Sequence, residues 1–295
     1  MLLKLLLKKR KKLPLTIQLP LAYLATLGKG KKFADSFAHV ETYCSFIGYS
    51  RSGHSLIAAL LDAHPNIVIA HELRAVKYFQ YGFGRNAIYY LLWQMTKIRG
   101  HSWKRGSGYT YDVPSQFQGS FEKIRVIGNK NGELTVRVLA DTPNLPQKLQ
   151  NVVKVPIKFV HVVRNPFDNI AAFAIKSAQR RNSEVEEADI QASIDRYFMV
   201  CASVMKVKTM ASDINAEVLD VFHEDFVKNP KAQLNKLCLW LGIEPSSNYL
   251  DDCAAVVFES PKKRRTKIQW NENFKQQIED KIGLFPFLEG YTFDS

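Results

Sequence analysis

The chain has 295 residues, of which 46% are hydrophobic and 23% are charged. This composition is that of an ordinary globular protein and excludes wholesale disorder. The length suffices for one α/β domain. Cys44, Cys201, Cys238 and Cys253 have neither the paired spacing of a zinc site nor the density of a disulfide framework. We expect four buried thiols, as suits a cytoplasmic protein.

Most of the formal net charge of +13 lies at the N-terminus. Residues 1–32 contain nine lysines and arginines, and no acidic residue precedes Asp35. Such a basic tail usually stays solvated, or rests against an anionic surface such as lipid headgroups or RNA. We therefore divide the chain into a basic and apolar extension, residues 1–40, and one domain, residues 41–295. No specific nucleic-acid partner is expected, and a peripheral membrane contact through residues 1–32 stays open.

The stretch from Leu13 to Leu27 is apolar, but it carries Pro14, Thr16, Gln18 and Pro20. It is shorter than the roughly 18 to 20 apolar residues that span a bilayer. It follows a basic cluster, as a signal-peptide core does, yet it ends in no clear small-x-small cleavage site.

Beyond residue 40, short apolar runs alternate with segments of helical periodicity. Asn165-Pro166 and Asn229-Pro230 are typical helix starts, and an amphipathic helix is predicted over residues 272–282. Strands that alternate with helices predict a central parallel sheet with helices on both faces. The expected strands are residues 43–49, 67–70, 124–127, 157–163 and 218–222.

Four polar residues follow the first four expected strands: Arg51, Glu72, Lys130 and Arg164. Ligands of parallel α/β sheets bind at the carboxyl ends of the strands, so these side chains are candidates for one site. Lys130 lies in Asn129-Lys130-Asn131-Gly132, which also reads as a solvated turn. Glu72 has an equally plain alternative role, as a surface carboxylate beside Arg74.

Residues 49–56 link the first strand to a helix and include Gly53. Backbone amides at a helix start form an anion cradle, and glycine lets that backbone approach its ligand closely. The guanidinium of Arg51 adds a fork of donors that suits phosphate or sulfate oxygens. The GxxxxGK[ST] loop of kinases is absent.

The run from Phe46 to Leu56, continued by residues 61–65 (Leu-Asp-Ala-His-Pro), resembles the 5′-phosphosulfate loop of sulfotransferases that use 3′-phosphoadenosine 5′-phosphosulfate (PAPS). Within this loop the likeness is to tyrosylprotein sulfotransferases and their bacterial relatives. Val163-Arg164-Asn165-Pro166 is similar to the family's 3′-phosphate motif. Further similarities in chain order extend the resemblance over residues 43–291, at Glu224 to Phe226, Leu241-Gly242-Ile243, and Trp270 to Tyr291.

The resemblance implies a P-loop-like sulfotransferase fold and transfer of a sulfuryl group from PAPS to an acceptor hydroxyl, with no metal. It implies that Glu72 is the general base, and that Lys130 stabilises charge on the leaving phosphate. It implies that Arg164, and Arg265 in the basic run 262–265, hold the 3′-phosphate. The 5′-phosphosulfate would be held by Arg51, Ser52, Gly53, His54, Ser55 and Leu56.

Two positions depart from the family pattern. His54 replaces a threonine of the loop, and Ala172 stands where the family usually has a serine on the 3′-phosphate. A catalytically degenerate module that binds PAPS or its product PAP (3′-phosphoadenosine 5′-phosphate) is therefore an alternative, as is a P-loop-type kinase. The aromatic segment 78–121 is predicted either to cover an acceptor or to pack in the core. The acceptor class does not follow from the sequence.

Overall fold

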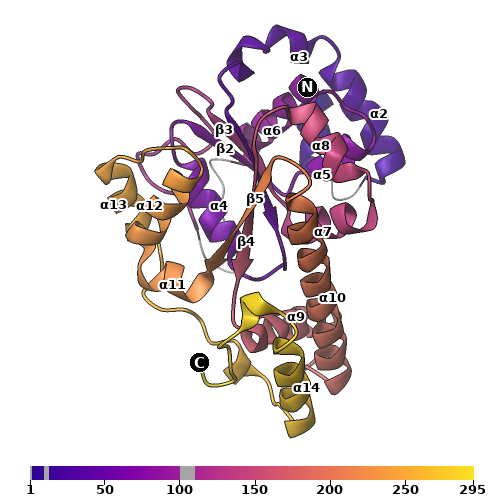
Figure 1. Ribbon diagram of the computed structural model, residues 1–295, viewed down its shortest axis with the longest axis vertical. Helices are drawn as coiled ribbons and strands as arrows, with labels where there is room; N and C mark the ends of the chain where they lie inside the picture. The colour runs from indigo at the N-terminus through magenta and orange to yellow at the C-terminus, as the bar shows by residue number, and fades with distance from the viewer. Residues whose placement is uncertain (1, 10–12, 100–109) are drawn as a thin grey trace.

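In the computed structural model, which describes residues 2–9, 13–99 and 110–295, five strands form one sheet (Figure 1). The strand order is β2-β3-β1-β4-β5, and every neighbouring pair is parallel. All five strands therefore end at the same edge of the sheet. The strands are β1 (Thr42–Ile47), β2 (Ile67–His71), β3 (Val126–Lys130), β4 (Ile157–Val163) and β5 (Ala216–Phe222).

Helices cover both faces of the sheet, as the sequence predicts. Successive side chains of a strand point to opposite faces, so Tyr43 and Ile47 join one hydrophobic core while Cys44 and Phe46 join another. The second core lies under α4 (His54–Asp62), α12 (Pro230–Trp240) and α13 (Ser247–Ala255). The first core lies under α5 (Ala75–Gln80), α6 (Arg85–Arg99), α7 (Gly132–Asp141), α8 (Leu145–Val153), α9 (Pro166–Arg181), α10 (Glu187–Ala211) and α14 (Glu272–Ile282).

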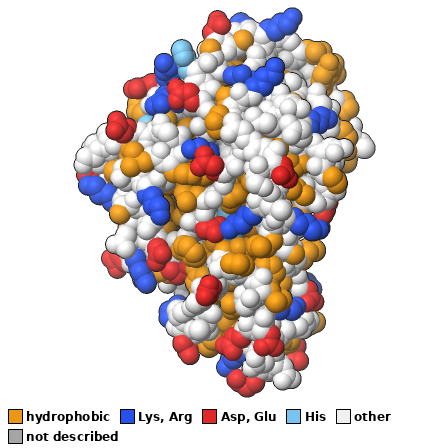
Figure 2. Space-filling view, viewed as in Figure 1, with side chains coloured by type: hydrophobic (Ala, Val, Ile, Leu, Met, Phe, Trp, Pro, Cys, Tyr) orange, Lys and Arg blue, Asp and Glu red, His pale blue; other side chains and the backbone are white. Residues whose placement is uncertain are grey.

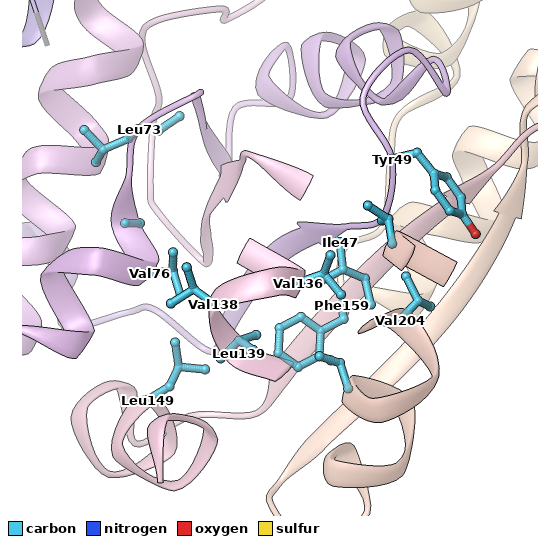
Figure 3. Close-up of a cluster of buried hydrophobic side chains, with 14 of the residues drawn as sticks. Ile47, Tyr49, Leu73, Val76, Val136, Val138, Leu139, Leu149, Phe159 and Val204 are labelled. Carbon is cyan, nitrogen blue, oxygen red and sulfur yellow. The ribbon is translucent and has the colours of Figure 1, made fainter. Parts of the chain in front are cut away.

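Figure 3 shows part of the first core, where α7 packs on the sheet. Val136 of α7 lies beside Ile47 of β1 and Phe159 of β4, and all three are buried. Leu139 of α7 and Leu149 of α8 extend the cluster away from the sheet. These contacts fix the position of the segment that follows β3, and with it one side of the candidate site.

The third strand differs from the prediction, because it includes residues expected in a turn. Gly128 pairs with Cys44 of β1, and a Cβ atom at Gly128 would lie only 1.9 Å from the carbonyl oxygen of Cys44. The amide of Asn129 donates to the carbonyl of Leu73 at 2.9 Å. A glycine at a close approach, and a polar side chain whose Nδ2 is bonded while its buried Oδ1 is not, thus continue the strand as far as Lys130.

The described parts of residues 1–40 pack on the domain, although a solvated tail was expected. The helices are α1 (Leu2–Lys9), α2 (Leu15–Thr26) and α3 (Lys29–Lys32), and they lie against α6. Leu6, Leu7 and Ala22 are buried in the first core. The domain boundary at residue 40 stays a prediction. In the described ranges, no helix has both the length and the apolar character to cross a membrane.

The aromatic segment 78–121 contributes to the first core through α5 and α6. Tyr78, Phe79 and Tyr89 are fully buried there. Residues 100–109 lie outside the described residues, so the hypothesis of an acceptor lid stays a prediction for that part.

Candidate active site

The loop between β1 and α4 has an unusual backbone. Gly48, Arg51 and Gly53 adopt positive φ values of 99°, 72° and 99°. Gly53 is the N-cap of α4, and a Cβ atom there would lie 2.3 Å from Nδ1 of His223. Only glycine fits this position without strain or displacement. No side chain caps the start of α4, and the amide of Leu56 donates to the carbonyl of Gly53 at 2.9 Å. A helix start without a side-chain cap is the kind of place where backbone amides meet an anion.

One bond within this loop and two from other elements hold it in place. The hydroxyl of Ser52 donates to the carbonyl of Tyr49 at 3.0 Å. From α9, the amide of Asn169 donates to the carbonyl of Ser50 at 3.2 Å. Arg164, which follows β4, donates from Nη1 to the carbonyl of Arg51 at 3.0 Å. These bonds give a donor to each of three loop carbonyls and so fix the conformation of the loop.

Lys130 links this loop to Glu72. Its side chain is 1% exposed, and Nζ donates to Oγ of Ser55 at 2.9 Å and lies 3.2 Å from Oε1 of Glu72. The amide of Glu72 in turn donates to the carbonyl of Lys130 at 2.8 Å. A buried ammonium is costly unless it is paired and hydrogen-bonded, so Lys130 is held where it meets both partners.

Glu72 lies at the end of β2 with a positive φ of 53°. This conformation is strained for glutamate and re-aims the side chain at the strand end. The side chain is 31% exposed, so one partner of the Lys130 pair remains accessible from solvent. Lys130 thus brings the carboxylate of Glu72 together with Ser55 in the first turn of α4, as expected for residues at the ends of parallel strands.

The side chain of Arg164 is buried and not at the surface. It is 7% exposed, and its Nη2 donates to the carbonyl of Lys262 at 2.5 Å. Its buried Nε has no hydrogen-bond partner. Burial lowers the pKa of Arg164, and the nearby carboxylates of Asp168 and Glu224 oppose that shift. Arg164 thus joins the loop to the basic run and keeps one donor uncommitted.

Arg265 is engaged elsewhere. Its backbone amide and its Nη1 each donate to Asp168 at 2.9 Å, and Nη2 donates to the carbonyl of Ser295. The residue is 3% exposed. The structure therefore pairs Arg265 with a carboxylate of α9 and does not bring its donors to the β1–α4 loop. Ala172, also on α9, is buried.

Two histidines flank the loop, and sequence reasoning identified one of them. The ring of His54 is 7% exposed and meets Phe46 edge-on, with 6.5 Å between the ring centroids. His223, the first residue of α11 (His223–Lys228), was missed, although its place directly after β5 marks it as a strand-end residue. Burial, assisted by the charge of Arg164, lowers the pKa of His223 to about 3, so its ring is neutral.

The cationic residues of the site thus follow three strand ends, and two of them contact the β1–α4 segment: Lys130 at Ser55 and Arg164 at the carbonyl of Arg51. Such an arrangement suits an anion with more than one charged group, such as a phosphate or sulfate ester. Among the residues that the structure describes, no three His, Cys, Asp or Glu side chains are grouped to bind a metal ion.

Comparison with solved structures finds sulfotransferases. The chain is similar to sulfotransferase STF9 from Mycobacterium avium, with 10% identity, a TM-score of 0.49, and coverage of 88% of this chain and 81% of that one. Mouse sulfotransferase SULT7A1 complexed with PAP has 13% identity and a TM-score of 0.45, and the match covers 85% of this chain and 84% of that one. The sulfotransferase domain of the Synechococcus PCC 7002 olefin synthase has 16% identity and a TM-score of 0.42, and the match covers 81% of this chain and 83% of that one.

No curated protein matches the sequence. The family assignment does not depend on the solved structures, since their TM-scores lie below 0.5. It depends on the model of the sulfotransferase family, which matches residues 46–247. That range contains the β1–α4 loop, Glu72, Lys130 and Arg164, and it covers more than half of the chain. The chain therefore belongs to the sulfotransferase family.

Proposed function

We propose that the protein transfers a sulfuryl group from PAPS to the hydroxyl of an acceptor. The observation that carries this proposal is the position of Lys130, whose ammonium touches both Ser55 at the start of α4 and the carboxylate of Glu72. A group bound on the loop and a group activated by Glu72 would therefore meet at this lysine. In-line transfer requires such a meeting of donor and acceptor.

The residues present fit the 5′ end of PAPS. Gly53 lets the ring of His223 pack against the helix start, and no side chain caps the first turn of α4. Arg51, within the loop, and Lys130, which contacts Ser55, would supply positive charge to a group bound there. At the 3′ end, the unpaired Nε of Arg164 is the donor that supports phosphate binding.

When bound, PAPS supplies a sulfuryl group already activated by its bond to a phosphate. Glu72 accepts the proton of the acceptor hydroxyl as that oxygen attacks sulfur, because its carboxylate is exposed on one side and held by Lys130 on the other. Lys130 and the first amides of α4 stabilise the negative charge that develops on the leaving phosphate oxygen. Arg51 orients the group from the open side of the loop.

Calorimetric titration with PAP, ADP and Mg·ATP tests the donor. We expect micromolar binding of PAP, weaker binding of ADP, and no requirement for Mg²⁺. Tight binding of Mg·ATP without binding of PAP would instead favour a kinase. Turnover is then tested with labelled PAPS against protein tyrosine, sugar, lipid and small-alcohol acceptors.

A second candidate is a module that binds PAPS or PAP without catalysis, and the 3′ side supports it. Arg265 is committed to Asp168, and Ala172 offers no hydroxyl. Both features reduce the donors available to a 3′-phosphate. PAP binding without transfer to any acceptor class would favour the module over the enzyme.

A further inference from the structure

Helix α2 exposes an apolar face that no described part of the chain covers. Ile17, Tyr23, Leu24 and Leu27 are 49%, 54%, 58% and 54% exposed. With Pro20, they fall within an arc of about 120° on a helix of 3.6 residues per turn. The opposite side, with Gln18, Ala22 and Thr26, is buried.

This face is a cluster and not a scatter of single residues. Four of the nine large hydrophobic side chains that are exposed in the described ranges lie on α2 or at its C-cap. No charged residue occurs from Leu13 to Gly28, although a helix against water normally has polar residues on its outer side. In Figure 1, α2 lies at the outer edge of the molecule, and Figure 2 shows hydrophobic side chains at the surface along that edge.

A basic groove adjoins the apolar face. Its volume is about 650 Å³, and Tyr23 and Leu27 line one side of it. Lys31, Arg85 and Lys154 are its charged lining residues, and none of its lining residues is acidic. Outside the groove, Lys29 and Lys32 of α3 are exposed. The apolar surface is therefore continuous with a cationic one.

We infer that α2 docks on a bilayer that contains anionic phospholipid. The apolar side chains would enter the boundary between headgroups and acyl chains, as interfacial helices do. The cations of α3 and the groove would bind the headgroup phosphates, which face the lysines at this boundary. A second copy of the chain is a poorer occupant, because it would bring another basic surface against this one.

Vesicle sedimentation with the full chain tests this inference. The wild type is expected to bind vesicles of phosphatidylcholine with 30% phosphatidylserine at least about tenfold better than vesicles of phosphatidylcholine alone. The triple variant Tyr23→Ser/Leu24→Ser/Leu27→Ser should lose about tenfold or more in binding to the anionic vesicles. Lys31→Gln/Lys154→Gln should reduce the preference for anionic lipid and its sensitivity to salt.

The control is Leu239→Ser/Leu284→Ser, which removes two exposed leucines, 51% and 70%, from α12 and from the turn after α14. This variant should bind vesicles as the wild type does. Thermal unfolding checks that every variant is folded. Equal vesicle binding by the wild type and the triple variant would overturn the inference, since the basic residues alone would then suffice. The inference would also be overturned if the wild type bound no vesicles, or if sedimentation velocity showed that the α2 face forms dimers instead.

Discussion

The Nζ atom of Lys130 lies 3.2 Å from Oε1 of Glu72, and the same nitrogen donates to Ser55 in the candidate phosphosulfate loop. One buried cation therefore contacts the proposed base and the proposed donor site together. The two functions can be separated by experiment, because Glu72 is partly exposed and can be changed without removing the lysine.

Replacing Glu72 with glutamine should abolish most transfer and leave binding of the donor product intact. The amide keeps the size of the side chain but cannot take a proton, and general-base catalysis typically contributes about 10²- to 10⁴-fold. The measurement is kcat with labelled PAPS, beside the Kd for PAP. Glu279→Gln, an exposed change on α14, serves as the control. If the Glu72→Gln enzyme were active, Glu72 would not be the general base.

Arg164→Ala should weaken binding of PAP more than binding of ADP. Its unpaired Nε is available to the 3′-phosphate, and a charged hydrogen bond is worth about 1.5–3 kcal/mol. Calorimetry with both nucleotides measures the difference. Equal weakening of the two would mean that Arg164 acts through its bond to the carbonyl of Arg51 and not on the 3′-phosphate.

Gly53→Ala should lower the free energy of unfolding by about 2 kcal/mol or more, because the new Cβ meets His223 and the positive φ disfavours alanine. PAP binding should weaken with it. Adding His223→Ala removes the obstacle but not the backbone strain, so the double variant should recover part of the loss. Urea unfolding of the four proteins gives the interaction energy, and strict additivity would show that His223 is not the obstacle.

The neutral ring of His223 predicts loss of stability in acid. Its folded pKa is about 3, below the ordinary 6.5, so between these values the unfolded chain binds a proton that the folded chain does not. Stability is complete above pH 6.5 and falls as the pH is lowered, by about 2 kcal/mol at pH 5 from this group. His223→Asn should flatten the profile of urea unfolding between pH 7 and pH 5.

Much of the fold could be predicted because hydrophobic pattern and capping agree over long segments. The fourth strand, residues 157–163, and the last helix, residues 272–282, have the predicted bounds. The bounds of β3 differ from the predicted ones, because Asn129 and Lys130 are polar and adjoin an Asn-Gly pair. Their strand conformation depends on partners far away in sequence, such as Leu73 and Ser55, which a local pattern does not include.

The candidate site was predictable to the same extent. The parallel sheet places the ends of four strands at one edge, so Arg51, Glu72, Lys130 and Arg164 could be grouped from sequence alone. The commitment of Arg265 to Asp168 could not, because a run of four basic residues does not show which one turns inward. The place of His223 under Gly53 required the actual distance between β5 and the loop.

The site is assembled from residues that are remote along the chain. Ser55 and Lys130 are 75 residues apart, and Arg51 and Arg164 are 113 apart. Contacts of such high sequence separation form late in folding, because the entropy of closing long loops must be overcome first. A nucleotide that needs both contacts thus has no partial site to bind in a half-folded chain. Its binding should disappear at the same denaturant concentration as the sheet itself, which makes ligand affinity a sensitive indicator of the native topology.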